Sequence, residues 1–315
     1  MESSRARRSR RSRPSRRRPL MYTALASVAI VGATAGGTVY VKAQAHSAAP
    51  SVSSAPSPTA AATSEEASVE PVTQPTVDHD KLLAKSMESV TVPGDADVSV
   101  AVLDLDSGES ATYGDAAFDT ASIVKVDILA ALLLRAQDED RHLTAAEKSY
   151  ATSMIENSDN VSASALWRII GQAEGLDAAN ERLGLTGTEG GDGMLWGLTQ
   201  TTAADQLTLL RQVFGDDSEL SSASREYVRG LMGRIAADQH WGVSAAAEGS
   251  AWALKNGWLP RSATGLWDIN SIGRVTAPDG HGYLVVALSN GNATKEKGIS
   301  LVESAAEAAV SVFTG

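Results

Sequence analysis

The chain of 315 residues contains no cysteine. A disulfide framework and a thiol nucleophile are therefore both excluded. Its five histidines form neither a His-Glu-x-x-His motif nor a pair four residues apart, so we expect no metal site and no cofactor. The chain also lacks a Gly-x-Ser-x-Gly elbow and a phosphate-cradling Gly-x-x-x-x-Gly-Lys loop, which argues against two further classes of enzyme.

Positive charge is scarce outside the N-terminus. Residues 1–20 hold nine arginines and a single acid, although the whole chain has a formal net charge of −11. The remainder is therefore strongly acidic, and we expect no binding of nucleic acid.

Residues 20–41 carry no charge and are long enough, as a helix, to cross a bilayer of roughly 30 Å. The arginines before them place residues 1–19 in the cytoplasm. We predict a single-pass anchor in the cell membrane with the C-terminal part of the chain outside the cell. A cleaved export signal, which would give a secreted protein, is the alternative because residues 43–45 (Ala-Gln-Ala) resemble a cleavage site.

Residues 42–77 consist mainly of Ser, Ala, Pro and Thr and are predicted to be a disordered linker. The rest of the chain, residues 78–315, is predicted to be one domain, which we expect to be monomeric.

Hydrophobic periodicity predicts an α+β domain with an antiparallel five-stranded sheet flanked by helices, and an all-helical lobe. The expected strands are residues 98–105, 110–113, 252–259, 266–275 and 283–289. Residues 106–108 (Asp-Ser-Gly) predict a hairpin between the first two strands. Helices are expected over residues 80–90 and 299–312, and residues 121–247 are predicted to be largely helical. The cleft between the sheet edge and the lobe is the expected site.

Lys125 stands in an almost wholly apolar stretch, residues 121–134 (ASIVKVDILAALLL), in which Asp127 is the only other charge. A helix without a polar face is buried, so an ammonium group on it needs a partner or a chemical task. Ser122 lies three residues earlier and shares the helix face of Lys125, at the first turn if Thr120 caps the helix. The pattern predicts a serine nucleophile beside a lysine base, with the Ser122 backbone N–H available to a tetrahedral oxyanion.

Ser158, Asp159 and Asn160 connect two predicted helices, and two interpretations stay open. These residue types are the preferred helix caps. Alternatively, the Ser158 hydroxyl relays a proton and the Asn160 amide holds a substrate carbonyl.

Lys255, Asn256 and Gly257 lie in a predicted strand, where a lysine and a glycine contribute little to sheet stability. Gly257 would let a substrate approach the strand edge, and Lys255 would face an anionic carboxylate. The Trp258 backbone N–H would be a second oxyanion donor. The alternative is a solvated lysine on an edge strand that opposes aggregation. Residues 196–205 (WGLTQTTAAD) are predicted to be a loop that ends in a capping box.

In this order, the Ser-x-x-Lys, Ser-Asp-Asn and Lys-x-Gly motifs resemble those of the penicillin-recognising serine hydrolases, and the stretches MIENSDN and TTAADQLTLLR are most similar to class A β-lactamases. The resemblance extends over residues 80–315. It implies that Ser122 is acylated by a β-lactam or a D-Ala-D-Ala-type peptide and that Lys125 helps to deprotonate it. It also implies that Lys255 binds the substrate carboxylate, with Ser158 and Asn160 in support.

The chain departs from the family pattern in three ways. The spacing of 36 residues between the first two motif serines is shorter than is typical of class A enzymes. Asn256 replaces the hydroxyl residue of Lys-Thr-Gly; its amide can donate to a carboxylate but cannot relay a proton. No Glu-x-x-Leu-Asn supplies the family's deacylating glutamate, and Glu189 and Asp192 are expected to be exposed loop acids. We therefore expect acylation of Ser122 with slow deacylation. A catalytically reduced binding module or a D,D-peptidase is the alternative.

Overall fold

The computed structural model describes residues 77–314. The predicted cytoplasmic segment (1–19), the predicted anchor or signal (20–41) and nearly all of the predicted linker (42–77) lie outside these residues. Within residues 77–314, no helix combines the length and the hydrophobicity needed to cross a bilayer.

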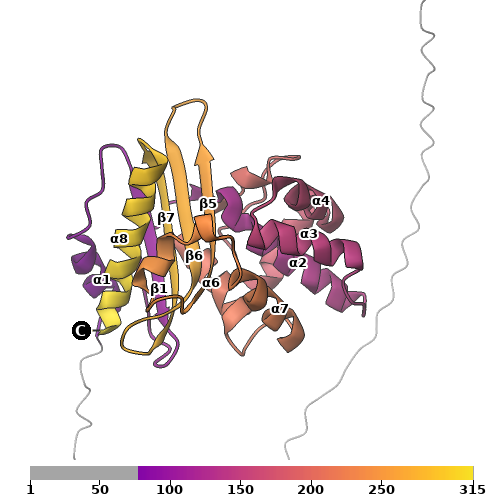
Figure 1. Cartoon of the computed structure of the whole chain (residues 1–315), viewed down its shortest axis with the longest axis horizontal. Coiled ribbons are helices and arrows are strands. Elements are labelled where there is room, and N and C mark those ends of the chain that lie inside the picture. The colour runs from indigo at the N-terminus through magenta and orange to yellow at the C-terminus, as the bar shows by residue number, and fades with distance from the viewer. Residues whose placement is uncertain (1–76, 315) are drawn as a thin grey trace, which may run out of the picture. The chain divides into compact units, whose positions relative to one another are not determined.

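Five antiparallel strands form the main sheet, in the spatial order β2-β1-β7-β6-β5 (Figure 1). They are β1 (Asp97–Asp104), β2 (Ser110–Tyr113), β5 (Trp252–Pro260), β6 (Trp267–Thr276) and β7 (Gly282–Asn292). The N-terminal hairpin therefore pairs with the last strand of the chain, and β5 lies at one edge. The predicted five-stranded antiparallel sheet is confirmed, with strand ends that differ by a few residues.

Both faces of the sheet are covered. Successive side chains of a strand point to opposite faces, so Ala101 and Leu103 pack toward the helical lobe, whereas Val100 and Val102 pack toward the C-terminal helix. The helices α1 (His79–Met87) and α8 (Lys295–Thr314) lie on this second face, and α6 (Ala203–Phe214) lies on the first. Burial on both sides explains why the middle strand, β7, is apolar at every position from Tyr283 to Leu288.

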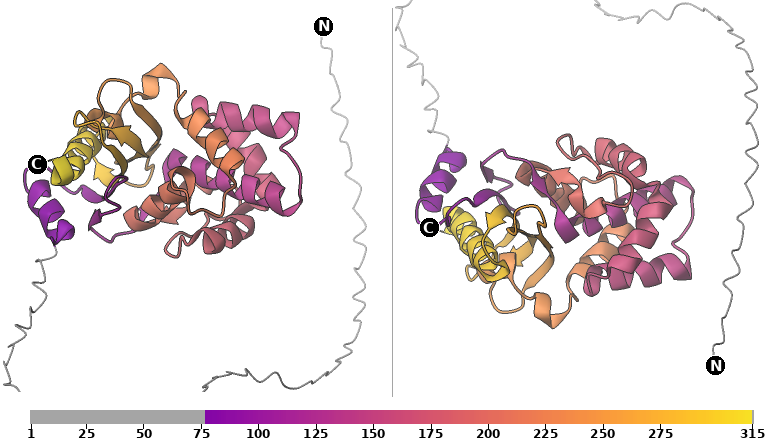
Figure 2. Two further views of the ribbon diagram at one scale, coloured as in Figure 1. Left: turned by 90° about the horizontal axis from the view of Figure 1, so that it is seen from below. Right: turned by 90° about the horizontal axis from the view of Figure 1, so that it is seen from above.

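The helical lobe lies beside the sheet, as the two further views in Figure 2 show. Its helices are α2 (Val124–Asp138), α3 (Ala145–Glu156), α4 (Asn160–Ile170), α5 (Gln172–Leu183) and α7 (Ser222–Met232). Helix α2 is at its centre and contacts all four of the others. This position explains why α2 has no polar face.

The predicted helical region is interrupted by a loop over residues 184–202. This loop contains the 3₁₀ turn η2 (Trp196–Leu198) and the strand β4 (Gln200–Thr201), which pairs with β3 (Phe118–Asp119) just before the predicted nucleophile. The sequence analysis missed both strands because two residues are too few to show an alternating pattern.

Truncation of Leu129 tests the central place of α2. Leu129 is fully buried in α2, whereas Leu82 of α1 is 41% exposed. We expect Leu129→Ala to lower the free energy of unfolding by about 3 kcal/mol, because it leaves a cavity in the lobe. Leu82→Ala is the matched control and should change stability by less than about 1 kcal/mol. Denaturant titration of both variants measures the difference, and equal losses would contradict this packing.

Candidate active site

Ser122 lies in the 3₁₀ turn η1 (Ala121–Ile123), which leads directly into α2. Thr120 does not cap this helix. Thr120 has helical backbone angles (φ −64°, ψ −28°) instead of the extended ones of an N-cap, and its hydroxyl makes no capping hydrogen bond. The structure nevertheless brings the predicted pair together, with 2.9 Å between Ser122 Oγ and Lys125 Nζ.

The Lys125 amine is enclosed by oxygen atoms. Besides Ser122 Oγ, it lies 2.7 Å from the Ser158 carbonyl oxygen, 3.0 Å from Ser158 Oγ and 2.8 Å from Asn160 Oδ1. Burial lowers the pKa of Lys125 to about 7, although the negative charge of Asp159 opposes the shift. A large fraction of this amine is therefore neutral near neutral pH and able to accept the Ser122 proton.

In the Ser-Asp-Asn turn, one residue caps a helix and the other two contact the buried lysines, so both interpretations left open by the sequence have support. Asp159 caps α4, since its carboxylate accepts a 2.7 Å hydrogen bond from the Ser162 backbone N–H. Ser158 has a positive φ of 54°, and its hydroxyl lies within 3.1 Å of both Lys125 Nζ and Lys255 Nζ. Asn160 uses Oδ1 for Lys125 and lines the cleft above Ser122.

Gly257 brings the edge strand β5 against the nucleophile. A Cβ atom at this position would stand 2.7 Å from the Thr120 carbonyl oxygen and 2.9 Å from the Ser122 backbone nitrogen. Only glycine permits this approach. Trp258, the next residue, lines the cleft together with Ser122, so the two backbone N–H groups predicted as oxyanion donors lie on segments in contact.

Lys255 is fully buried, so it is not a solvated edge-strand lysine. Its amine donates to Ser158 Oγ at 3.1 Å and to the Asn256 carbonyl oxygen at 2.9 Å. Burial, and to a smaller extent the positive charge of Lys125, lower the pKa of Lys255 well below its ordinary value. Lys255 and Lys125 thus meet at a single hydroxyl group.

The prediction that the Asn256 amide faces a substrate carboxylate is wrong. Its side chain is fully buried, and its amide nitrogen donates to the carbonyl oxygens of Gln239 (2.8 Å) and Trp241 (3.0 Å). Because side chains alternate along a strand, Asn256 points away from the face that carries Lys255 and Gly257. It therefore joins β5 to the preceding segment instead of facing a substrate carboxylate.

The cleft above Ser122 has a volume of about 540 Å³. Its walls are mostly apolar and come from residues 194–198 and 258–263, with Asn160 and Ser164 of α4 on one side. Arg261 is the only charged residue among the described lining residues, and it forms an ion pair with Asp119. A second cavity, of about 480 Å³, lies between α2, α3 and α7 and does not include Ser122.

Trp196 is the site residue that the sequence analysis missed. The sequence pattern predicts only that Trp196 lies in a loop. In the structure its side chain is half-buried, and the centroid of its ring lies 5.1 Å from Lys125 Nζ. The same loop ends as predicted at a helix cap, Thr202, whose side chain accepts a hydrogen bond from the Asp205 N–H. A reciprocal capping box is not formed, because the Asp205 carboxylate accepts from Gly187 and Thr188 instead.

Glu189 and Asp192 are exposed and do not line the cleft. Their positions agree with the prediction that they are exposed loop acids.

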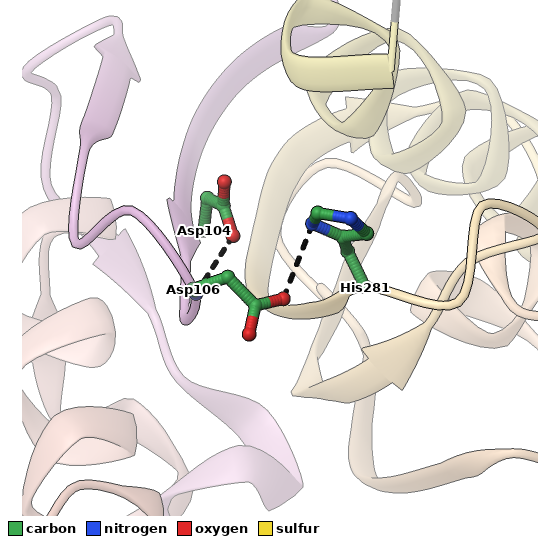
Figure 3. A group of neighbouring side chains, drawn as sticks. All are labelled: Asp104, Asp106 and His281. Carbon is green, nitrogen blue, oxygen red and sulfur yellow. Dashed lines mark hydrogen bonds and ion pairs between the residues drawn. The ribbon is translucent and has the colours of Figure 1, made fainter.

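Three side chains away from the cleft could offer ligand atoms to a metal ion: Asp104, Asp106 and His281 (Figure 3). Their atoms lie within 4.8 Å of one another. Local contacts account for the arrangement: Asp104 accepts from the Asp106 N–H and the Ser107 hydroxyl, both at 2.9 Å, and Asp106 lies 3.2 Å from the His281 ring nitrogen. The group stabilises the β1–β2 turn and contributes nothing to the Ser122 site.

Comparison with known proteins identifies the family and the fold. A profile of the Beta-lactamase enzyme family matches residues 144–313, a range that begins after Ser122 and Lys125. The structure of PBP-A is similar, with a TM-score of 0.64 and 21% identity over 74% of this chain and 96% of PBP-A. A mutant of PBP-A in an acyl-enzyme complex with penicillin G is also similar, with a TM-score of 0.63 and 22% identity over 74% of this chain and 96% of that one.

The TLA-1 extended-spectrum β-lactamase is also similar, with a TM-score of 0.65 and 14% identity over 75% of this chain and 98% of that one. At these identities the likeness to solved structures shows a shared fold. No protein in the curated set matches the chain.

The titration of Lys125 gives the site a characteristic pH dependence. We expect the rate of Ser122 modification by a small sulfonyl fluoride to rise with pH through about 7 and then to level off, because only the neutral amine accepts the proton. Lys125→Met should lower the plateau rate at least about a hundredfold. Lys125→Arg is the matched control: it keeps the charge but cannot deprotonate, and it should be equally slow. A rate that does not change between about pH 5 and pH 9 would contradict the assignment of Lys125 as the base.

Proposed function

Because the chain belongs to the Beta-lactamase enzyme family and is a serine hydrolase, we propose that Ser122 is acylated by β-lactams or by related D-Ala-D-Ala-type cell-wall peptides, and that the ester is then hydrolysed slowly. The observation that carries this proposal is the 2.9 Å contact between Ser122 Oγ and the buried Lys125 amine, at the base of an open cleft.

Acylation follows from the contacts around Ser122. The neutral Lys125 amine takes the hydroxyl proton while Ser122 Oγ attacks the carbonyl carbon of the substrate. The backbone N–H groups of Ser122 and Trp258 are the donors available to the oxyanion. When the amide C–N bond breaks, the Ser158 hydroxyl gives the leaving nitrogen a proton and regains one from a neighbouring lysine; its contacts with Lys125 and Lys255 support this role. The protonated form of Lys255, although buried and with a lowered pKa, would attract a substrate carboxylate through its place beside this hydroxyl.

Slow deacylation is supported by what lines the cleft. Among its described lining residues there is neither a carboxylate nor an imidazole. The described lining of the cleft therefore offers no carboxylate or imidazole base to activate a water molecule for attack on the ester. Mostly apolar walls further disfavour an ordered water.

Intact-mass measurement tests the proposal. Incubation of the full chain with benzylpenicillin should give a stoichiometric adduct that persists after the excess compound is removed. Ser122→Ala should abolish the adduct, whereas Ser262→Ala, which alters another serine of the cleft wall, should retain it. Rapid hydrolysis of a cephalosporin would contradict slow deacylation. Absence of an adduct would favour the alternative, a binding module for cell-wall peptides.

We further propose that residues 20–41 hold the protein in the cell membrane, with the hydrolase domain outside the cell. The proposal is supported by the uncharged length of this segment and the arginines before it. N-terminal sequencing of the protein from cells tests it: an N-terminus at about residue 46 would show a cleaved signal and a secreted protein.

A further inference from the structure

The indole of Trp196 completes the surroundings of the Lys125 amine. Three residues provide oxygen atoms around Nζ: Ser122, Ser158 and Asn160. The Trp196 ring, 5.1 Å from Nζ at its centroid, covers a further side at a distance typical of a cation–π contact. Lys125 consequently has no exposed surface, although it adjoins an open cleft.

The position of Trp196 is fixed by its loop. The indole N–H donates to Ser164 Oγ of α4 at 3.1 Å. The turn that carries Trp196 is closed by a 2.8 Å hydrogen bond from the Leu198 N–H to the Leu195 carbonyl oxygen. The Thr120 N–H donates to the Thr199 carbonyl oxygen at 2.9 Å and so ties this turn to the segment before Ser122. The ring is therefore held over the amine from two sides.

Hydrolysis of a Ser122 ester needs a water molecule at this place. The water oxygen must attack the ester carbonyl carbon while a base takes one of the water protons. The carbon–Oγ bond then breaks, Ser122 Oγ regains a proton, and the acyl group leaves as a carboxylic acid. Among the described residues, Lys125 is the titratable base in hydrogen-bond contact with Ser122 Oγ. Oxygen atoms of Ser122, Ser158 and Asn160 lie within 3.0 Å of this amine, so the side that faces the indole is the one at which we place the approach of a water molecule.

We propose that Trp196 keeps the acyl-enzyme long-lived by holding its indole ring where a hydrolytic water would contact the Lys125 amine. Trp196 is thus a positioning residue that acts through Lys125. The inference rests on the proposed acylation of Ser122 and adds the reason why the lysine that promotes acylation does not also promote deacylation.

The decay of the adduct tests this inference. The full chain is acylated with benzylpenicillin and freed of excess compound, and the loss of the adduct is followed by intact mass at several pH values. Trp196→Ala should lose the adduct at least about tenfold faster than the unmodified chain, with a rate that rises with pH as Lys125 becomes neutral. Trp196→Phe keeps an aromatic ring over the amine and should decay as slowly as the unmodified chain.

Thr188→Val is the control for loop mobility. The Thr188 hydroxyl bonds to Thr201 (2.8 Å) and Asp205 (2.6 Å) at the base of the loop and does not line the cleft. This variant removes two hydrogen bonds at the base of the loop and leaves the Trp196 side chain itself unchanged. It should keep the slow decay; equal acceleration in Thr188→Val and Trp196→Ala would overturn the role of the ring.

The remaining outcomes separate this inference from the proposed function. An adduct that persists equally in Trp196→Ala and in the unmodified chain would overturn the shielding role and leave acylation intact. If Trp196→Ala does not fold, as judged by circular dichroism, Trp196→Leu replaces it; this side chain fills part of the space but does not reach over the amine. No adduct on the unmodified chain would overturn acylation, and this inference with it.

Discussion

The site depends on the burial of an amine that has no acidic partner in contact with it. Lys125 and Lys255 both reach the hydroxyl of Ser158, at 3.0 and 3.1 Å, and both are fully buried. Two ammonium groups at one hydroxyl repel each other, and burial disfavours the charge on each. Folding therefore lowers the pKa of Lys125 to about 7, so a large fraction of the amine beside Ser122 is neutral near neutral pH. The apolar helix α2, with the lobe packed around it, excludes the water that would otherwise stabilise the charge.

Holding this arrangement requires unfavourable backbone conformations at two positions. Ala121 (φ 48°) precedes the nucleophile, and Ser158 (φ 54°) carries the shared hydroxyl. Non-glycine residues with such angles cost of order 1–3 kcal/mol each and persist only where surrounding contacts impose them. Here Gly257 of β5 presses against η1, and the Asp159 cap fixes the start of α4 next to Ser158. The sheet edge and the lobe thus fix the backbone of the site from opposite sides.

The fold could be predicted from patterns that repeat along the chain. Single contacts between distant segments could not be predicted in this way. The alternating strands and the apolar stretch around Lys125 predicted the sheet, the helices and the Ser122–Lys125 pair. The orientation of Asn256 depends on strand phase and on the carbonyl groups of residues 239–241, which no motif reveals. Trp196 lies 71 positions after Lys125 in a loop without periodicity, so only the fold brings its ring to the amine.

Asp127, the other charged residue in the apolar stretch around Lys125, connects α2 to the loop that carries Trp196. Asp127 is two residues from Lys125, so the two side chains do not face each other and do not form an ion pair. Burial raises the pKa of Asp127 to about 7, and its Oδ1 accepts from the Gln206 amide of α6. Gln206 also donates to Thr201, whose hydroxyl meets that of Thr188 at the base of the loop. One face of α2 therefore presents the base to Ser122, while another connects the helix to the loop that holds Trp196 over that base. Both connections therefore start from the same buried helix.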